Sequence, residues 1–344
     1  MLTSSVVVPI LNAAHTLPDC LRALDALHPS PSEIILVDNG SSDASQALIQ
    51  QFARDSHTYE VRLVQAMERG ASAARNAGVT VASGDIIAFT DADCSPAPDW
   101  LGRLLAAFDD HEVGAVAGRV VGNRGSTMLE LFSTLYTLQL PKEPALHDRW
   151  TPLQGGYPTA NLALRRSVLE TLHGFDESVV IYGEDYDLCA RLYAEGWRLL
   201  YLPDAQVIHH HRTSLFGLLR QAYGFGLGHA YLIRKHLAQG LWMDLPRGST
   251  MWSRAPVTGW IDCVSADKKC LGLLAVALIA PTFGWLPPAY LLLLAWQARR
   301  RAAAEQLEPS WLTSVGLGLL LIAKSGAMTT GRWVGSVKYG TLCL

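Results

Sequence analysis

The first 120 residues alternate short apolar runs with amphipathic stretches, and this alternation constrains the fold more than any other feature. Runs such as SSVVVPI and SEIILVD have the length and the β-branched content of buried strands. Stretches such as HTLPDCLRALDAL repeat leucine at intervals of three and four residues, as amphipathic helices do. The order β-α-β-α predicts an α/β fold with a mostly parallel sheet and helices on both faces.

Aspartates follow two of the predicted strands. Asp38 comes after EIILV, and Asp91 and Asp93 form a D-A-D sequence after IIAFT. Aspartate is common in turns, so each position taken alone is explained as the end of a strand. Parallel strands, however, bring their carboxyl ends to one edge, where ligands of such sheets bind. Two acidic strand ends at that edge predict a polar site, whereas Asp85 opens its strand at the far edge and is expected to be structural.

A second group of polar residues lies further along the chain. Glu184 and Asp185 begin the helical stretch EDYDLCARL, and three histidines occupy positions 209–211. Both features also have structural explanations, because acids in a first helical turn complement the helix dipole and histidines suit a solvated loop. Asp187 and Arg191 are expected to hold this helix in place.

The composition and the missing motifs disfavour several function classes. The net charge is −3, so there is no broad basic field to hold nucleic acid. The six cysteines form no C-x-x-C pair, which indicates neither a zinc site nor a disulfide framework. The chain has no G-x-x-x-x-G-K-[ST], and PILNAAH follows the first strand instead of G-x-G-x-x-G. A phosphate loop, a Rossmann dehydrogenase and a sugar nucleotidyltransferase are therefore disfavoured.

If the acidic edge holds a nucleotide diphosphate, its negative charges must be countered. Because the chain lacks a glycine-rich phosphate loop, a divalent cation is the other way to counter them. Mg²⁺ or Mn²⁺ binds carboxylates together with phosphate oxygens. The two-residue spacing of Asp91 and Asp93 at a turn lets both side chains address one ion. Such an ion also acts as a Lewis acid on a leaving diphosphate.

The chain resembles family 2 glycosyltransferases with the GT-A type fold over roughly residues 4 to 215. A lone D-x-D is a weak signal, but seven segments in the family's order are specific. The matching segments are VVVPILN (6–12), VDNGSSD (37–43), RGASAARNAG (69–78), DIIAFTDAD (85–93), GGYPTANLALRR (155–166), GFDE (174–177) and GEDYDLCARL (183–192).

On the donor side, the resemblance implies roles for five residues. Asp38 is implied to hydrogen-bond the nucleotide base, and Pro9 to line the base and ribose. Arg75 is implied to lie near the nucleotide and its phosphates. Asp91 and Asp93 correspond to the D-x-D that holds the nucleotide diphosphate and the metal, with Asp93 as the stronger metal ligand.

The remaining implied roles concern the metal and the acceptor. His209 resembles a histidine that completes the metal or diphosphate site in some members. Asp185 corresponds to the general base of inverting members, and Glu184, expected on the acceptor side, is its competitor. Asn161 is expected to line the acceptor. Because a helix dipole keeps a carboxylate at its N-terminus ionised, we expect Asp185 to accept a proton at neutral pH.

These roles imply an inverting, metal-dependent hexosyl- or related transferase that uses a nucleotide-diphosphate sugar in one in-line displacement. We expect it to act in envelope glycan, polysaccharide or glycolipid synthesis, on a glycan, lipid-linked or small-molecule acceptor. The region after the predicted base lacks the Q-x-x-R-W motif of processive members, which favours transfer of one or a few sugars. The alternative is a catalytically inactive, nucleotide-binding scaffold of a membrane glycan assembly.

The C-terminal part predicts attachment to a membrane. Residues 271–296 carry no charge and have basic residues beyond both ends, but Pro281, Pro287 and Pro288 interrupt them. This pattern leaves a re-entrant hairpin and a kinked span open. A second apolar segment, 311–323, is expected to span the membrane or to lie at its interface.

These features predict three parts: a GT-A catalytic domain at 1–215, an amphipathic, interfacial connector at 216–265 and a membrane-associated helical region at 266–344. Because nucleotide sugars are cytosolic, the predicted location is the cell membrane with the catalytic domain facing the cytoplasm.

Overall fold

The protein forms two compact units, each assembled from separate stretches of the chain. The first takes in Met1–Asn123, Leu138–Val180 and Glu184–His210, and the second takes in Arg124–Thr137, Ile181–Gly183 and His211–Leu344. The division at residues 215 and 265 stays a prediction. The computed structural model describes residues 2–55, 57–123, 127–137, 140–152, 154–179, 182–210, 214–237, 240–246, 248–255 and 257–344.

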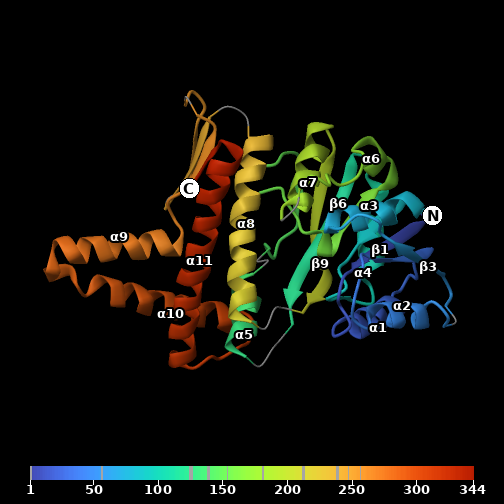
Figure 1. Cartoon of the computed structure of the whole chain (residues 1–344), viewed down its shortest axis with the longest axis horizontal. Helices are drawn as coiled ribbons and strands as arrows, with labels where there is room; N and C mark the ends of the chain where they lie inside the picture. The colour runs from blue at the N-terminus through green and yellow to red at the C-terminus, as the bar shows by residue number, and fades with distance from the viewer. Residues whose placement is uncertain are drawn as a thin grey trace. The chain divides into compact units, whose positions relative to one another are not determined.

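The first unit alternates strands and helices, as its hydrophobic periodicity predicts (Figure 1). The short strand β5, directly after the D-A-D sequence, is an addition that periodicity does not indicate. The elements are β1 (Ser4–Ile10), α1 (Leu17–Asp25), β2 (Glu33–Asp38), α2 (Ser45–Phe52), β3 (Glu60–Gln65), α3 (Ala71–Val81), β4 (Ile86–Phe89), β5 (Cys94–Pro96), α4 (Trp100–Ala106), β6 (Val113–Gly122), β7 (Ala145–His147), β8 (Leu162–Arg165), α6 (Arg166–Thr171), α7 (Glu184–Ala194) and β9 (Arg198–His209).

These strands form one sheet within the described residues. Its order is β3-β2-β1-β4-β8-β6-β9-β5, and β7 also pairs with β9. β1 is parallel to β2 and β4, β2 is parallel to β3, and β6 is parallel to β9. β8 runs antiparallel to both of its neighbours. Most paired residues are therefore parallel, which confirms the predicted α/β class.

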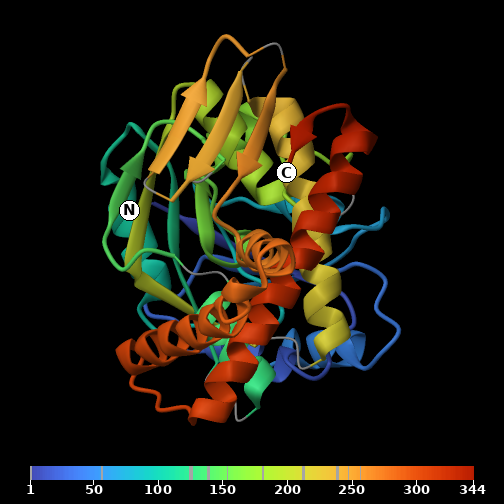
Figure 2. The same cartoon turned by 90° about the vertical axis from the view of Figure 1, so that its left-hand side faces the viewer.

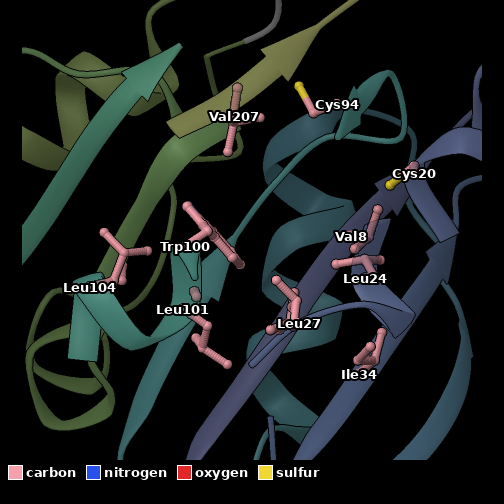
Figure 3. Close-up of a cluster of buried hydrophobic side chains, with 14 of the residues drawn as sticks. Val8, Cys20, Leu24, Leu27, Ile34, Cys94, Trp100, Leu101, Leu104 and Val207 are labelled. Carbon is pink, nitrogen blue, oxygen red and sulfur yellow. The ribbon is translucent and has the colours of Figure 1, made fainter. Parts of the chain in front are cut away.

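Alternate residues of the central strands face opposite sides of this sheet, and helices cover each side. Val6 and Val8 of β1 belong to a buried cluster that includes residues of α1, α2 and α4. Figure 3 shows part of it, with Leu24 of α1 and Trp100 of α4 among the labelled side chains. Val7 belongs to a second buried cluster with residues of α3, α6 and α7. The strand period of two thus produces three layers, helix–sheet–helix.

The second unit combines long helices with a small sheet. Figures 1 and 2 show α8 and α11 side by side, and α9 and α10 as the two arms of a helical hairpin. In the sheet, β10 lies between β11 and β12, and β13 pairs with β12. The elements are α5 (Met128–Tyr136), α8 (Leu215–His236), β10 (Leu241–Leu245), β11 (Gly248–Trp252), β12 (Gly259–Asp262), α9 (Ala266–Ile279), α10 (Leu286–Ala304), α11 (Trp311–Tyr339) and β13 (Leu342–Cys343).

Glycines allow α8 and α11 to approach closely. A Cβ atom on Gly226 of α8 would lie 2.1 Å from the carbonyl oxygen of Met328, and one on Gly331 of α11 would lie 2.1 Å from that of Tyr223. Beside Gly331, the buried Arg332 donates from Nη1 to Asp262 Oδ2 at 2.8 Å. One face of α11 is therefore held by protein.

The two apolar segments predicted from the sequence have different structures. Segment 311–323 forms the first half of α11, which, among the described helices, is the one long and apolar enough to cross a membrane by length and composition. Segment 271–296 is divided between α9 and α10, and the short turn η3 (Pro281–Phe283) joins them. The segment therefore folds as a hairpin and not as one kinked helix.

Candidate active site

The acidic strand ends lie at one edge of the first unit's sheet. Asp38 ends β2 and Asp91 follows β4, while β1 lies between these strands and is parallel to both. The chain leaves β1 for β2 on one side and returns to β4 on the other. Such a switch point opens a crevice beyond the carboxyl ends of the strands, which is where open α/β sheets bind ligands.

The carboxylate of Asp38 is buried and held in a fixed orientation. The backbone amide of Ser41 donates to Oδ1 at 3.1 Å, and Gln46 Nε2 donates to Oδ2 at 2.7 Å. Burial would raise the pKa of Asp38, but these hydrogen bonds outweigh burial and lower it. Pro9, predicted beside the base, is partly buried in β1 opposite Val37. Asp38 is thus an ionised, pre-oriented acceptor at the carboxyl end of β2.

Arg75 of α3 connects the D-A-D turn to the start of α7. Its side chain is 5% exposed, and Nη2 donates to Asp91 Oδ1 while Nη1 donates to Glu184 Oε1, both at 2.9 Å. Burial disfavours its charge, but the two carboxylates outweigh burial and raise the pKa of Arg75. Both terminal nitrogens are engaged by protein, so the predicted contact of Arg75 with nucleotide phosphates stays a prediction.

Asp185 lies in the first turn of α7, and its Oδ1 accepts a hydrogen bond from the backbone amide of Tyr186 at 2.9 Å. Burial, reinforced by the negative charge of Glu184 and opposed by Arg75, raises the pKa of Asp185 from 3.8 to about 7. The expectation that the helix dipole alone keeps this carboxylate ionised is therefore corrected. A group that titrates near neutrality is well suited to accept a proton, so the chemistry proposed for Asp185 is retained.

Asp93 and His209 come together beside the D-A-D turn. The antiparallel pairing of β5 with β9 sets Cys94 opposite His209. His209 Nε2 lies 3.5 Å from Asp93 Oδ2, and the ligand atoms of Asp93, Cys94 and His209 all lie within 4.8 Å of one another. The side chain of Asp93 is 43% exposed, so it remains open to a ligand.

This donor set fits a hard or borderline divalent cation. A carboxylate oxygen with an imidazole nitrogen suits Mn²⁺, whereas a thiolate would favour zinc. Burial, followed by the charges of Asp93 and Asp91, raises the pKa of the Cys94 thiol well above its ordinary value. Without a cation the thiol is therefore held protonated, and Asp93 and His209 offer the donor atoms that suit Mn²⁺. Asp91 faces Arg75 with one oxygen and is not part of this group.

Asn161 lies in the core and not at the crevice. It is fully buried, and its Nδ2 donates to the carbonyl oxygens of Arg119 at 3.0 Å and Ala205 at 2.8 Å. Its Oδ1 accepts from Trp100 Nε1 at 2.7 Å, and Gly118 makes room for it, since a Cβ there would lie 2.4 Å from Nδ2. This saturated geometry favours a structural role for Asn161 over the predicted contact with an acceptor.

Two features of the site escape reasoning from the sequence. Cys20 Sγ donates to the carbonyl oxygen of Asp91 at 3.6 Å, and Cys94 donates to Asp93 Oδ1 at the same distance, so buried thiols support the acidic turn. The position of Cys94 directly after D-A-D was the available signal. The link from Arg75 to Glu184 joins residues 109 positions apart and leaves no local signature. Of the predicted histidines, His211 lies outside the described residues.

Comparison with known proteins identifies relatives along the same part of the chain. A family model described as glycosyl transferase family 2 matches residues 5–172. The glycosyltransferase AglE of Haloferax volcanii is 30% identical over 251 residues, which cover 70% of this chain and 79% of that protein. The pre-mycofactocin glycosyltransferase of Mycobacterium tuberculosis is 33% identical over 236 residues, which cover 67% of this chain and 48% of that protein. The chain thus spans about half the length of the mycobacterial relative.

The fold also has a counterpart among solved structures. The mannosyltransferase PcManGT from Pyrobaculum calidifontis, in complex with GDP-Man and Mn²⁺, is similar with a TM-score of 0.55 and 22% sequence identity. The similarity covers 94% of this chain and 86% of that one. At this level of identity, the likeness supports the architecture of the chain.

Proposed function

Because this chain belongs to glycosyl transferase family 2, we propose that it is an inverting transferase that moves a sugar from a nucleotide-diphosphate donor to an acceptor hydroxyl. One observation carries the proposal. Asp185, whose pKa is raised to about 7, directly follows Glu184, which Arg75 ties to the D-A-D turn. A candidate base and a candidate diphosphate site are thus linked through one buried guanidinium.

The proposed donor site is the crevice at the carboxyl ends of β2 and β4. Asp38 accepts a hydrogen bond from the nucleotide base, because its ionised carboxylate has acceptors only. Asp93 and His209 hold Mg²⁺ or Mn²⁺, with Asp91 beside them. When bound, the cation supplies Lewis-acid stabilisation of the leaving diphosphate. Arg75 holds Asp91 in place through the hydrogen bond from its Nη2.

The proposed reaction is a single displacement. The acceptor oxygen attacks the anomeric carbon from the face opposite the diphosphate, and Asp185 takes the hydroxyl proton as the new C–O bond forms. The bond from the anomeric carbon to the diphosphate breaks, and its electron pair leaves with the diphosphate. The configuration inverts, and no covalent bond forms to the enzyme. Glu184 is the weaker candidate for the base, because Arg75 engages its Oε1.

We place the enzyme at the cell membrane, with the catalytic unit on the cytoplasmic side and a glycan or lipid-linked acceptor. The apolar α11 and the exposed hairpin of α9 and α10 support the membrane location. Nucleotide sugars are supplied in the cytosol, which supports the cytoplasmic orientation of the catalytic unit.

Calorimetry with a panel of nucleoside diphosphates and nucleotide sugars, with and without Mn²⁺, tests this function. We expect one nucleotide to bind in a Mn²⁺-dependent manner, and Asp93→Ala to weaken that binding about tenfold or more, since it removes a metal ligand. Asp204→Ala is the matched control, because its carboxylate is 82% exposed in the same unit. Equal binding by Asp93→Ala would contradict the metal site. Normal binding without release of diphosphate in the presence of acceptors would favour the inactive scaffold.

A further inference from the structure

The hairpin of α9 and α10 exposes many large apolar side chains. Residues 270–298 contain no charged side chain, and of the residues of α9 only Asp267 is buried. Leu278 and Ile279, at the end of α9, are 83% and 86% exposed. Contiguous apolar patches of this kind mark a contact with protein or membrane. The other large exposed apolar side chains of the hairpin are Leu271, Leu274, Val276, Phe283, Trp285, Leu292, Leu293 and Trp296.

The base of the hairpin, in contrast, is fixed to the rest of the second unit. Asp267 accepts a hydrogen bond from Ser325 at 2.6 Å, and Lys268 Nζ donates to the carbonyl oxygen of Asp262 at 2.6 Å. Ala298 and Ala302 of α10 are fully buried in a cluster with residues of α5, α8 and α11. The charged ends therefore lie where the hairpin joins the unit, and the apolar part extends away from them (Figure 1).

Basic residues surround this base on both arms. Lys268 and Lys269 precede the apolar part of α9, and residues 299–301, all arginine, follow that of α10. The guanidinium of Arg300 lies 4.9 Å from the ring centroid of Trp296. A basic collar with a tryptophan next to it suits the headgroup layer of an anionic membrane, where both side-chain types are enriched.

The turn at the tip leaves few backbone donors to satisfy. Pro281, Pro287 and Pro288 have no N–H group. The N–H groups of Ala280, Phe283 and Gly284 donate to carbonyl oxygens within the turn or the preceding helix, at 2.9, 2.9 and 3.0 Å. Because an unsatisfied N–H group is costly in hydrocarbon, this turn is suited to lie among lipid chains.

The length of the arms limits how deep the hairpin reaches. The uncharged part of α9, Cys270–Ile279, is about 15 Å long at the helical rise of about 1.5 Å per residue. The hydrocarbon core of a bilayer is about 30 Å thick. The uncharged part of α10, residues 286–298, is about 20 Å long by the same rise. Neither arm is long enough to cross the core, and the basic residues at both bases keep the two ends on the same side.

We propose that the α9–α10 hairpin is a monotopic anchor that inserts into a single leaflet of an anionic bilayer and returns to the same surface. The inference deepens the membrane location of the proposed function and rests on it, but not on the catalytic chemistry. It decides between the two membrane arrangements that the sequence leaves open, in favour of the re-entrant one.

Flotation of the full-length protein with vesicles of phosphatidylcholine and phosphatidylglycerol tests insertion. Leu278→Asp is expected to lower the vesicle-bound fraction about tenfold or more, because it places a charge among the lipid chains. Met67→Asp is the matched control, since Met67 is 91% exposed in the first unit, and it is expected to float like the wild type. Unchanged flotation of Leu278→Asp would overturn the proposal. The proposal would also be overturned if the wild-type protein did not float but formed a dimer, and if Leu278→Asp separated that dimer.

A label at the tip tests the depth. Ile279→Cys is labelled with an environment-sensitive fluorophore after Cys263→Ser and Cys270→Ser, since the other native cysteines are buried. We expect the strongest quenching by lipids brominated near the chain ends, and no reaction of the unlabelled cysteine with an impermeant thiol reagent trapped inside the vesicles. Reaction with the trapped reagent would show a span and contradict the proposal. Nucleotide binding by the hairpin variants is measured in detergent as well. Normal binding there, together with failed insertion, would count against the membrane anchor and not against the proposed function.

Discussion

Glu184 and Asp185 are adjacent acids whose surroundings assign them different tasks. Arg75 Nη1 engages Glu184 at 2.9 Å, whereas Asp185 accepts from the amide of Tyr186 on its own helix. Burial and the charge of Glu184 raise the pKa of Asp185 to about 7, and Arg75 opposes that shift. From these different environments we expect Glu184 to hold the site together and Asp185 to be the group that accepts a proton.

The pH dependence of turnover follows from Asp185. The proposed base must be ionised, so with saturating donor we expect kcat to rise with pH through about 7 and to level off above it. Asp185→Asn should lower kcat by about 10²- to 10⁴-fold, because it removes general-base catalysis. Steady-state assays across pH measure both effects. A flat profile in the wild type, with chemistry limiting, would contradict the role of Asp185.

The raised pKa of Asp185 also affects stability, which should fall as pH rises, whereas kcat should increase. Its folded pKa lies above the ordinary value of 3.8, so the folded state holds a proton that the unfolded state releases between these values. Stability from this residue is therefore lost as pH rises from about 4 through about 7. We expect Asp185→Asn to raise Tm at about pH 8 and to change it little at about pH 4. A lower Tm at the higher pH would show that the buried carboxylate is stabilising.

Glu184→Gln distinguishes the two acids as bases. Removing the charge of Glu184 removes one of the causes that raise the pKa of Asp185. The kcat profile should therefore move to lower pH, with activity retained at high pH. Glu170→Gln, at an exposed ion pair with Arg166, is the control and should leave the profile unchanged. Loss of kcat at every pH in Glu184→Gln would make Glu184 the base.

Among the elements, α7 depends on an ion pair whose buried carboxylate, Asp187, comes two residues after the candidate base. Asp187 is fully buried, and its Oδ2 lies 2.8 Å from Arg191 Nε. The two terminal nitrogens of Arg191 donate to the carbonyl oxygens of Leu172 and Gly174 at 2.7 and 2.9 Å. This network fixes α7 against the segment before it, as expected from the sequence.

Asp187→Ala should therefore lower the free energy of unfolding by about 2 to 3 kcal/mol, because the partly exposed guanidinium of Arg191 loses its fully buried carboxylate partner. Asp99→Ala removes an ion pair with the same four-residue spacing, but its side chains are 56% and 46% exposed. We expect that control to cost about 0.5 kcal/mol or less. Urea unfolding measures both values, and equal costs would show that burial does not strengthen the Asp187 pair.

Sequence periodicity predicts the longer strands and helices of the first 122 residues because each of them carries its own local pattern, whereas the short β5 does not. Leu17, Leu21 and Leu24 mark the buried face of α1 without reference to any other element. The contact of Asp93 with His209 is different, since it depends on the register of β5 against β9. That register follows from tertiary packing, so the metal-site geometry could only be implied by resemblance.

For the whole molecule, the proposal assigns catalysis to the first unit and membrane attachment to the second. Six of the seven family-like segments lie wholly in the first unit, and the seventh does so from Glu184 onward. For the second unit, the sequence predicts an amphipathic connector and an apolar region but leaves a hairpin and a kinked span open, because a long uncharged run does not reveal where it reverses. Its fold into α9 and α10 depends on the prolines around residue 281 and on packing of α10 against α11.

The stereochemistry of transfer tests the central claim most directly. With the donor identified by calorimetry, nuclear magnetic resonance of the product gives the anomeric configuration of the transferred sugar. We expect inversion by the wild type, and nucleotide binding without product in Asp185→Asn. Retention of configuration, or full product formation by Asp185→Asn, would contradict a single displacement with Asp185 as its base.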